Sequence, residues 1–176
     1  MKREWRITIG YAYATGSYSE GDQRKGILYV IDVADPTRPG KVASVELPDH
    51  TSSNVTLAGD YAYVALADCY YFTCSGSLQM IDISHPAQPR LASSLDVPGG
   101  VFAVTVADDG DGSGRYGYLA AGEVGVWVVD ASDPAQPHLV GLENTPGRAR
   151  GIAVVDDLIY VGDGKGGFLI LRVVKT

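Results

Sequence analysis

The sequence VIDVADP at residues 30–36 recurs as MIDISHP at residues 80–86 and as VVDASDP at residues 128–134. In every copy a second proline follows three residues after the first, and the shared aspartates are spaced 50 and 48 residues apart. A fourth, incomplete copy is GFLILR at residues 167–172, which matches GVWVVD at residues 125–130. Self-similarity at such a period is typical of repeat architectures.

A second recurring piece lies upstream of each copy. It reads YAY at residues 11–13, YAYV at 61–64, YGYL at 116–119 and LIYV at 158–161. These aromatic, β-branched and small residues predict strands, and the repeated prolines predict turns because proline lacks a donor and fixes φ. No stretch has the apolar periodicity of a helix. Each unit of about 42–50 residues is therefore predicted to be a four-stranded antiparallel meander, the size of one β-propeller blade.

The repeat divides residues 1–176 into a single domain of four units, at about residues 5–50, 51–99, 100–147 and 148–176. We expect an all-β fold, a partial or small β-propeller of four four-stranded antiparallel blades whose last blade lacks its outer strand. Three arrangements satisfy this strand count. The chain is part of a larger propeller, or two half-rings associate through open blade faces, or four blades close into a ring.

The motif VIDVADPTRP, together with GDYAYVA at residues 59–65, resembles the LVIVD-repeat family over nearly the whole chain, from about Ile7 to Val173. That family is bacterial and archaeal and commonly exported or surface-attached. The resemblance implies a β-propeller without an established activity, and its motifs carry no known catalytic residues. The chain departs from the pattern at His85, where two other copies have Asp35 and Asp133, and at Arg172, where the others have aspartate.

Composition limits the partners. The chain has 14 basic and 21 acidic residues, a net charge of -7. Nucleic acid and anionic membranes need a basic face, so neither is expected as a partner. No apolar run approaches the roughly 20 residues that cross a bilayer. The first ten residues begin with positive charge but lack the apolar segment of a signal peptide.

The two cysteines, Cys69 and Cys74, bracket four residues between two predicted strands. A disulfide that closes a small ring is our preferred interpretation; free thiols or a metal or redox pair are the alternatives. If the disulfide forms, we expect an extracellular or cell-surface protein whose leader this chain lacks. Between the cysteines, Tyr70, Tyr71 and Phe72 are predicted to lie on a loop, as a ridge that contacts a ligand or partner or as a loop folded over its own blade.

The loop at residues 108–114 supplies the candidate metal ligands Asp109, Asp111 and Ser113. Alternating oxygens followed by glycine resemble the opening of a calcium loop, so calcium is the one cofactor that the sequence suggests. Ala120 stands where a full loop of that kind has glutamate, and a solvated hairpin is the alternative.

The repeated aspartates Asp32, Asp82 and Asp130 are expected to order the turns that follow them by accepting backbone hydrogen bonds. His50, His85 and His138 are expected at the surface.

The shared residues of the repeat are structural, and no catalytic signature such as GxSxG, HExxH or a P-loop is present. We therefore expect a non-catalytic binding module. The alternatives are a propeller enzyme that acts as a metal-assisted hydrolase or lyase, and a half-ring that assembles with another chain.

Overall fold

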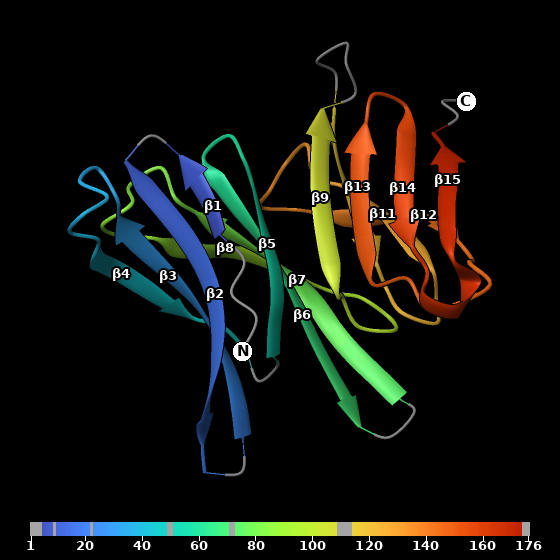
Figure 1. Ribbon diagram of the computed structural model, residues 1–176, viewed down its shortest axis with the longest axis horizontal. Helices are drawn as coiled ribbons and strands as arrows, with labels where there is room; N and C mark the ends of the chain where they lie inside the picture. Colours follow the sequence, from blue (N-terminus) through green and yellow to red (C-terminus); the bar gives the residue numbers. More distant parts are fainter. Residues whose placement is uncertain are drawn as a thin grey trace.

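A computed structural model describes residues 5–8, 10–21, 23–48, 51–70, 73–108 and 114–173 of the chain. The described residues form fifteen strands in four antiparallel sheets, three of four strands and one of three (Figure 1). The predicted all-β fold of four propeller blades, with an incomplete last blade, is confirmed. Among the described residues, no helix has the length and hydropathy that a membrane span requires.

Each sheet follows chain order from its first strand to its last. Blade 1 contains β1 (Trp5–Thr8), β2 (Tyr11–Glu20), β3 (Gln23–Asp32) and β4 (Gly40–Glu46). Blade 2 contains β5 (Thr51–Ala58), β6 (Tyr61–Tyr70), β7 (Thr73–Asp82) and β8 (Arg90–Asp96). Blade 3 contains β9 (Ala103–Asp108), β10 (Arg115–Ala120), β11 (Val126–Asp130) and β12 (His138–Glu143). Blade 4 contains β13 (Gly151–Val155), β14 (Leu158–Gly162), the 3-10 turn η1 (Gly164–Gly166) and β15 (Phe168–Arg172).

Blades 2 and 3 bury apolar residues on both of their faces, because each has a neighbouring blade on either side. We call the face turned toward the next blade in the chain the forward face, and the opposite one the backward face. The forward face of blade 1, with Tyr13 and Val30, packs on the backward face of blade 2, with Val64 and Ile81. The same arrangement recurs twice, in an apolar core between blades 2 and 3 and another between blades 3 and 4.

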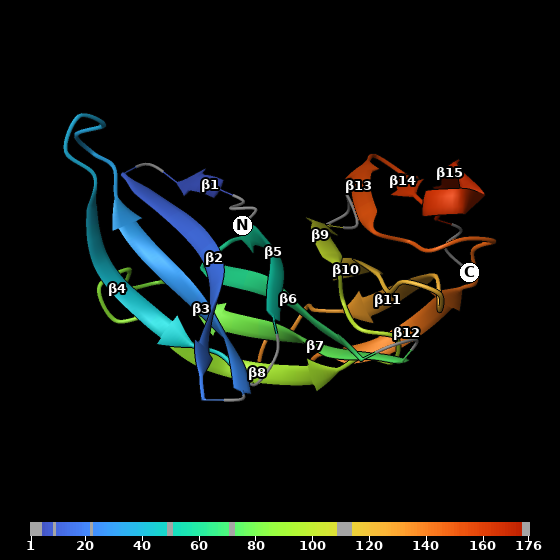
Figure 2. The same ribbon diagram turned by 60° about the horizontal axis from the view of Figure 1, so that its bottom comes forward.

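The four sheets stand along an arc with their first strands on the inside (Figure 2). β5 contacts β2 on one side and β9 on the other, and β9 contacts β13. A side chain joins two of these inner strands, because Oδ1 of the buried Asn54 accepts a hydrogen bond of 2.9 Å from the N–H of Val104. The described strands of blades 1 and 4 do not pack against each other as consecutive blades do.

The segment around the cysteines differs from its prediction. It was predicted to be a loop, but β6 and β7 continue to Tyr70 and from Thr73, and Cys69 and Cys74 are paired across the ladder. The physical reason is that cross-strand hydrogen bonds continue past the body of the blade, so the hairpin lengthens rather than opening into a loop.

Candidate functional site

Two long hairpins, one in blade 1 and one in blade 2, project at the lower end of the molecule in Figure 1. The hairpin β2–β3 pairs from Tyr11 with Asp32 to Glu20 with Gln23, and β6–β7 pairs from Tyr61 with Asp82 to Tyr70 with Thr73. The corresponding strands of blades 3 and 4 are only five or six residues long and are joined by tight turns. All four hairpins point to the lower end of the molecule in Figure 1, which we call the hairpin end.

The tip of the β6–β7 hairpin is closed by a disulfide between Cys69 and Cys74. The predicted disulfide is therefore present in the structure. The described residues include no free cysteine. The predicted contact ridge cannot be placed. Tyr70 ends β6, and Tyr71 and Phe72 lie outside the described residues.

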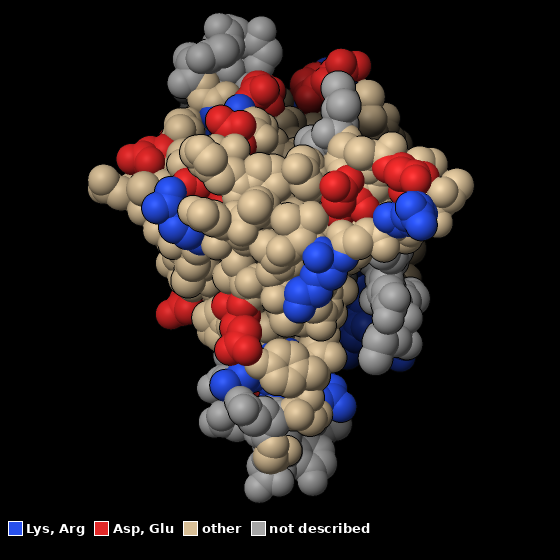
Figure 3. Space-filling model, turned by 90° about the vertical axis from the view of Figure 1, so that its left-hand side faces the viewer, with Lys and Arg blue, Asp and Glu red and all other residues tan. Residues whose placement is uncertain are grey.

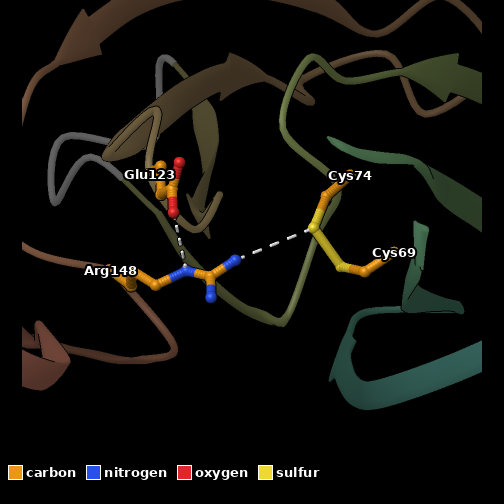
Figure 4. Close-up of a disulfide and its surroundings, with 4 residues drawn as sticks. All are labelled: Cys69, Cys74, Glu123 and Arg148. Carbon is orange, nitrogen blue, oxygen red and sulfur yellow. Dashed lines mark hydrogen bonds and ion pairs between the residues drawn. A yellow bond between two sulfur atoms is a disulfide. The ribbon is translucent and has the colours of Figure 1, made fainter. Parts of the chain in front are cut away.

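Arg148 links this hairpin to two other blades. It precedes β13 in blade 4, and its Nε lies 3.4 Å from Oε1 of Glu123 in the β10–β11 turn of blade 3. Nη2 of Arg148 lies 4.0 Å from Sγ of Cys74 in blade 2. Figure 4 shows the guanidinium between the carboxylate and the disulfide. Arg148 lies outside the repeat motifs, and its signal in the sequence is two arginines, RAR at residues 148–150, just before a strand in an acidic chain.

Asp163 fixes the backbone that carries Arg148. Its side chain is buried and accepts hydrogen bonds of 2.6 Å from the hydroxyl of Thr145 and of 2.6 Å from the N–H of Gly147. Its carbonyl oxygen accepts a hydrogen bond of 2.9 Å from the N–H of Arg148. The segment before β13 is therefore held by three hydrogen bonds to one buried residue.

Two further cations lie at the same end of blade 4. The guanidinium of Arg150 stands 5.1 Å from the ring centroid of Phe102, a cation–π contact. Lys165 is exposed in the turn η1 that joins β14 to β15. We define the hairpin-end surface as Phe102, Glu123, Arg148, Arg150 and Lys165 together with the Cys69–Cys74 disulfide.

The predicted role of the repeated aspartates is confirmed. Asp32, Asp82 and Asp130 end the third strands of blades 1, 2 and 3, and each accepts a hydrogen bond of 2.9 Å from the backbone N–H two residues later. The hydroxyl of Ser84 also donates to Asp82, at 2.6 Å. Hydrogen bonds from Ser84 lower the pKa of Asp82 below its ordinary value, and those from Ser132 do the same for Asp130.

These shifts predict a stability that depends on pH. Because the folded-state pKa values of Asp82 and Asp130 are lowered, the stabilisation is present above the unfolded pKa of about 4 and is lost as the pH falls below it. Urea unfolding midpoints measured from pH 7 to pH 3 should fall across this window. The fall should be shallower in a variant with both Asp82→Asn and Asp130→Asn, and an unchanged dependence would contradict this role.

The other candidate ligands divide into two groups. Asp109, Asp111 and Ser113 lie outside the described residues, as does His50, so the calcium hypothesis is untested. His85 and His138 are exposed, as predicted. Within the described part of the chain, no cluster of three or more His, Cys, Asp or Glu residues could hold a metal ion.

An apolar groove of about 580 Å³ runs between blades 3 and 4. Tyr118 and Val128 line it from blade 3, and Ile159 and Leu171 from blade 4. Gly141 of β12 is among the lining residues and stands opposite Val128, where the outer strands of blades 1 and 2 have Ala43 and Ser93 opposite Val30 and Met80.

The comparisons with known proteins agree with this architecture. A crystal structure of the computationally designed Ika4 protein matches with a TM-score of 0.63 and 12% identity, over 97% of this chain and 89% of that one. A crystal structure of the computationally designed Ika8 protein matches with the same TM-score and identity, over 96% of this chain and 57% of that one. This chain therefore spans just over half of the Ika8 chain. At such identities the likeness concerns the fold alone.

The search of curated proteins gives no match to this sequence. The family model described as the LVIVD repeat, in contrast, matches residues 50–97, 107–145 and 146–173. The first and third segments span the strands of blades 2 and 4, the second begins near the end of β9 and continues through the rest of blade 3, and together they cover more than half of the chain. The chain therefore belongs to the LVIVD-repeat family.

Proposed function

We propose that this protein is a non-catalytic binding module that holds an acidic peptide segment of its partner at the hairpin-end surface. The observation that carries the proposal is the concentration of cations there, with Arg148, Arg150 and Lys165 at one end of blade 4 in a chain of net charge -7. Arginine is enriched in protein interfaces because its planar guanidinium binds carboxylates bidentately and stacks on aromatic rings.

The surface is preorganised, which favours binding over a merely solvated charge cluster. Asp163 holds the backbone of residues 145–148 in place, and Glu123 and the disulfide flank the guanidinium of Arg148. A group that is already ordered loses little conformational entropy when a partner binds. Arg150, an exposed residue, adds a second guanidinium, which lies over an aromatic ring.

The β6–β7 hairpin borders the hairpin-end surface on one side. Blades 3 and 4 end in short turns at this end, while β6–β7 extends beyond them with its tip closed by the disulfide. A peptide that lies on Arg148 and Arg150 would therefore also meet the side of this hairpin. The disulfide supports the hairpin, since it prevents the tip from fraying.

The experiment is selection of random peptides displayed on phage against the full chain, followed by affinity measurement for the selected peptides. We expect peptides enriched in Asp and Glu, whose affinity falls about tenfold or more in Arg150→Ala, as for a residue at the centre of an interface. Arg90→Ala is the matched control, because Arg90 is 75% exposed on the outer strand of blade 2, away from this surface.

Two outcomes would overturn the proposal. One is the failure of any peptide to bind the wild-type chain specifically. The other is a set of peptides without acidic residues, or peptides that bind Arg150→Ala as tightly as the wild type.

A further inference from the structure

The forward face of blade 4 carries apolar residues that the repeat buries elsewhere. Phe168 and Ile170 of β15 are 67% and 58% exposed. The residues at the repeat position of Phe168 in blades 1, 2 and 3 are fully buried, namely Leu28, Leu78 and Val126. At the position of Ile170, Val30 and Met80 are also fully buried. In each of those blades the next blade covers the face.

The exposed residues form a continuous face rather than scattered positions. Tyr160 pairs with Ile170 across the ladder, and its ring stacks on Phe168 with centroids 6.0 Å apart. Tyr160 occupies the repeat position of Tyr13 and Tyr63, both of which are buried in the cores between blades. The forward face of blade 4 therefore has the same kinds of residue as the faces that a following blade covers.

Blade 1 shows the complementary feature on its backward face. Ile31 and Val33 are only half-buried, whereas Ile81 and Ile83 at the same repeat positions in blade 2 are buried by blade 1. Figure 3 views the molecule from the side on which blade 1 lies, and the middle of that side is largely uncharged. The backward face of blade 1 therefore has the same kinds of residue as the face of blade 2 that a preceding blade covers.

We propose that a second copy of this chain covers both faces, so that blade 1 of each copy packs on blade 4 of the other. The chain itself already contains this interface three times, since a forward face with Tyr and apolar third-strand residues packs on a backward face at each blade junction. The two uncovered faces lie at opposite ends of one arc (Figure 2). Joining two arcs in this way closes eight blades into a ring with twofold symmetry.

The first test is the mass of the full chain in solution, by light scattering over a range of concentrations. We expect twice the chain mass of 18.6 kDa at high concentration, with dissociation on dilution. A mass of one chain at every concentration would overturn the proposal. A mass that grows without limit would overturn it too, because head-to-tail contacts that do not close form filaments.

Variants test which faces meet. Ile170→Glu and Ile31→Glu each place a charge in the proposed interface, and each should weaken the dimer at least about tenfold. Leu91→Glu is the matched control, because Leu91 is 46% exposed on the outer strand of blade 2, outside both faces, and this variant should remain dimeric. Since these side chains are partly exposed in one chain, the folded monomer should persist, which circular dichroism would verify.

The pairing of blade 1 of each copy with blade 4 of the other predicts a further result for a mixture of variants. Each variant keeps one intact face, so a mixture of Ile170→Glu and Ile31→Glu should form dimers with one good interface, more tightly than either variant alone. Dissociation by Ile170→Glu together with no effect of Ile31→Glu would show that two copies of blade 4 pack on each other, and would overturn the head-to-tail proposal.

Discussion

Replacing Met80 with alanine is expected to lower the free energy of unfolding by about 2–5 kcal/mol. Met80 has no exposed surface and lies in the core between blades 2 and 3, among Tyr63, Leu78 and Leu119. Truncation removes the transfer free energy of the lost groups and leaves a cavity that two neighbouring sheets cannot both relax to fill. Urea denaturation followed by tryptophan fluorescence would measure the loss.

The chain supplies its own control for Met80. Ile170 occupies the same position of the repeat but is 58% exposed, so Ile170→Ala should lower the free energy of unfolding by less than about 1 kcal/mol, when both are measured on the single chain at high dilution. Equal losses at the two positions would contradict the assignment of Ile170 to an uncovered face.

Replacing Gly76 with alanine is expected to lower the free energy of unfolding by about 4 kcal/mol or more, and the melting temperature by about 10 °C or more. A Cβ at this position would overlap the carbonyl oxygen of Leu66 and lie 2.8 Å from the Cα of Gly100. The carbonyl of Leu66 accepts a hydrogen bond of 3.0 Å from the N–H of Val101. The substitution therefore separates the β6–β7 hairpin from the segment that connects blade 2 to blade 3.

Gly151→Ala is the matched control for Gly76→Ala. Gly151 also lies in a strand, but nothing stands within 4 Å of the position of an added Cβ. Alanine costs less conformational entropy than glycine, so this variant should be neutral or slightly stabilising. A loss at Gly151 as large as that at Gly76 would show that glycine is needed for a reason other than the close approach of backbones.

The sequence predicted the blades because the repeat reports backbone requirements directly. The turn at each repeated proline follows the end of a third strand, and Asp32, Asp82 and Asp130 make the turn hydrogen bonds that their positions predicted. The recurring pieces at residues 158–161 and 167–172 likewise correspond to β14 and β15 of blade 4. These features depend on residues that are close together in the sequence, which is why a sequence pattern can predict them.

The candidate site depended on contacts between blades, which the repeat cannot report. Arg148 lies 25 residues after Glu123 and 74 after Cys74, and these three meet only because three blades stand side by side. The length of the β6–β7 hairpin was missed because YYF between two cysteines is as typical of a loop as of strand ends. The uncovered face of blade 4 has the same residue types as covered faces, so exposure alone distinguishes it.

The central claim is that the four blades pack face to face and that none of the described residues covers the forward face of blade 4. Thiol labelling tests it most directly, with the separate variants Met80→Cys and Ile170→Cys, at a protein concentration where the mass is that of one chain. The native cysteines are paired in a disulfide and do not react. We predict rapid alkylation at position 170 and protection by orders of magnitude at position 80. Similar rates at the two positions would contradict the account.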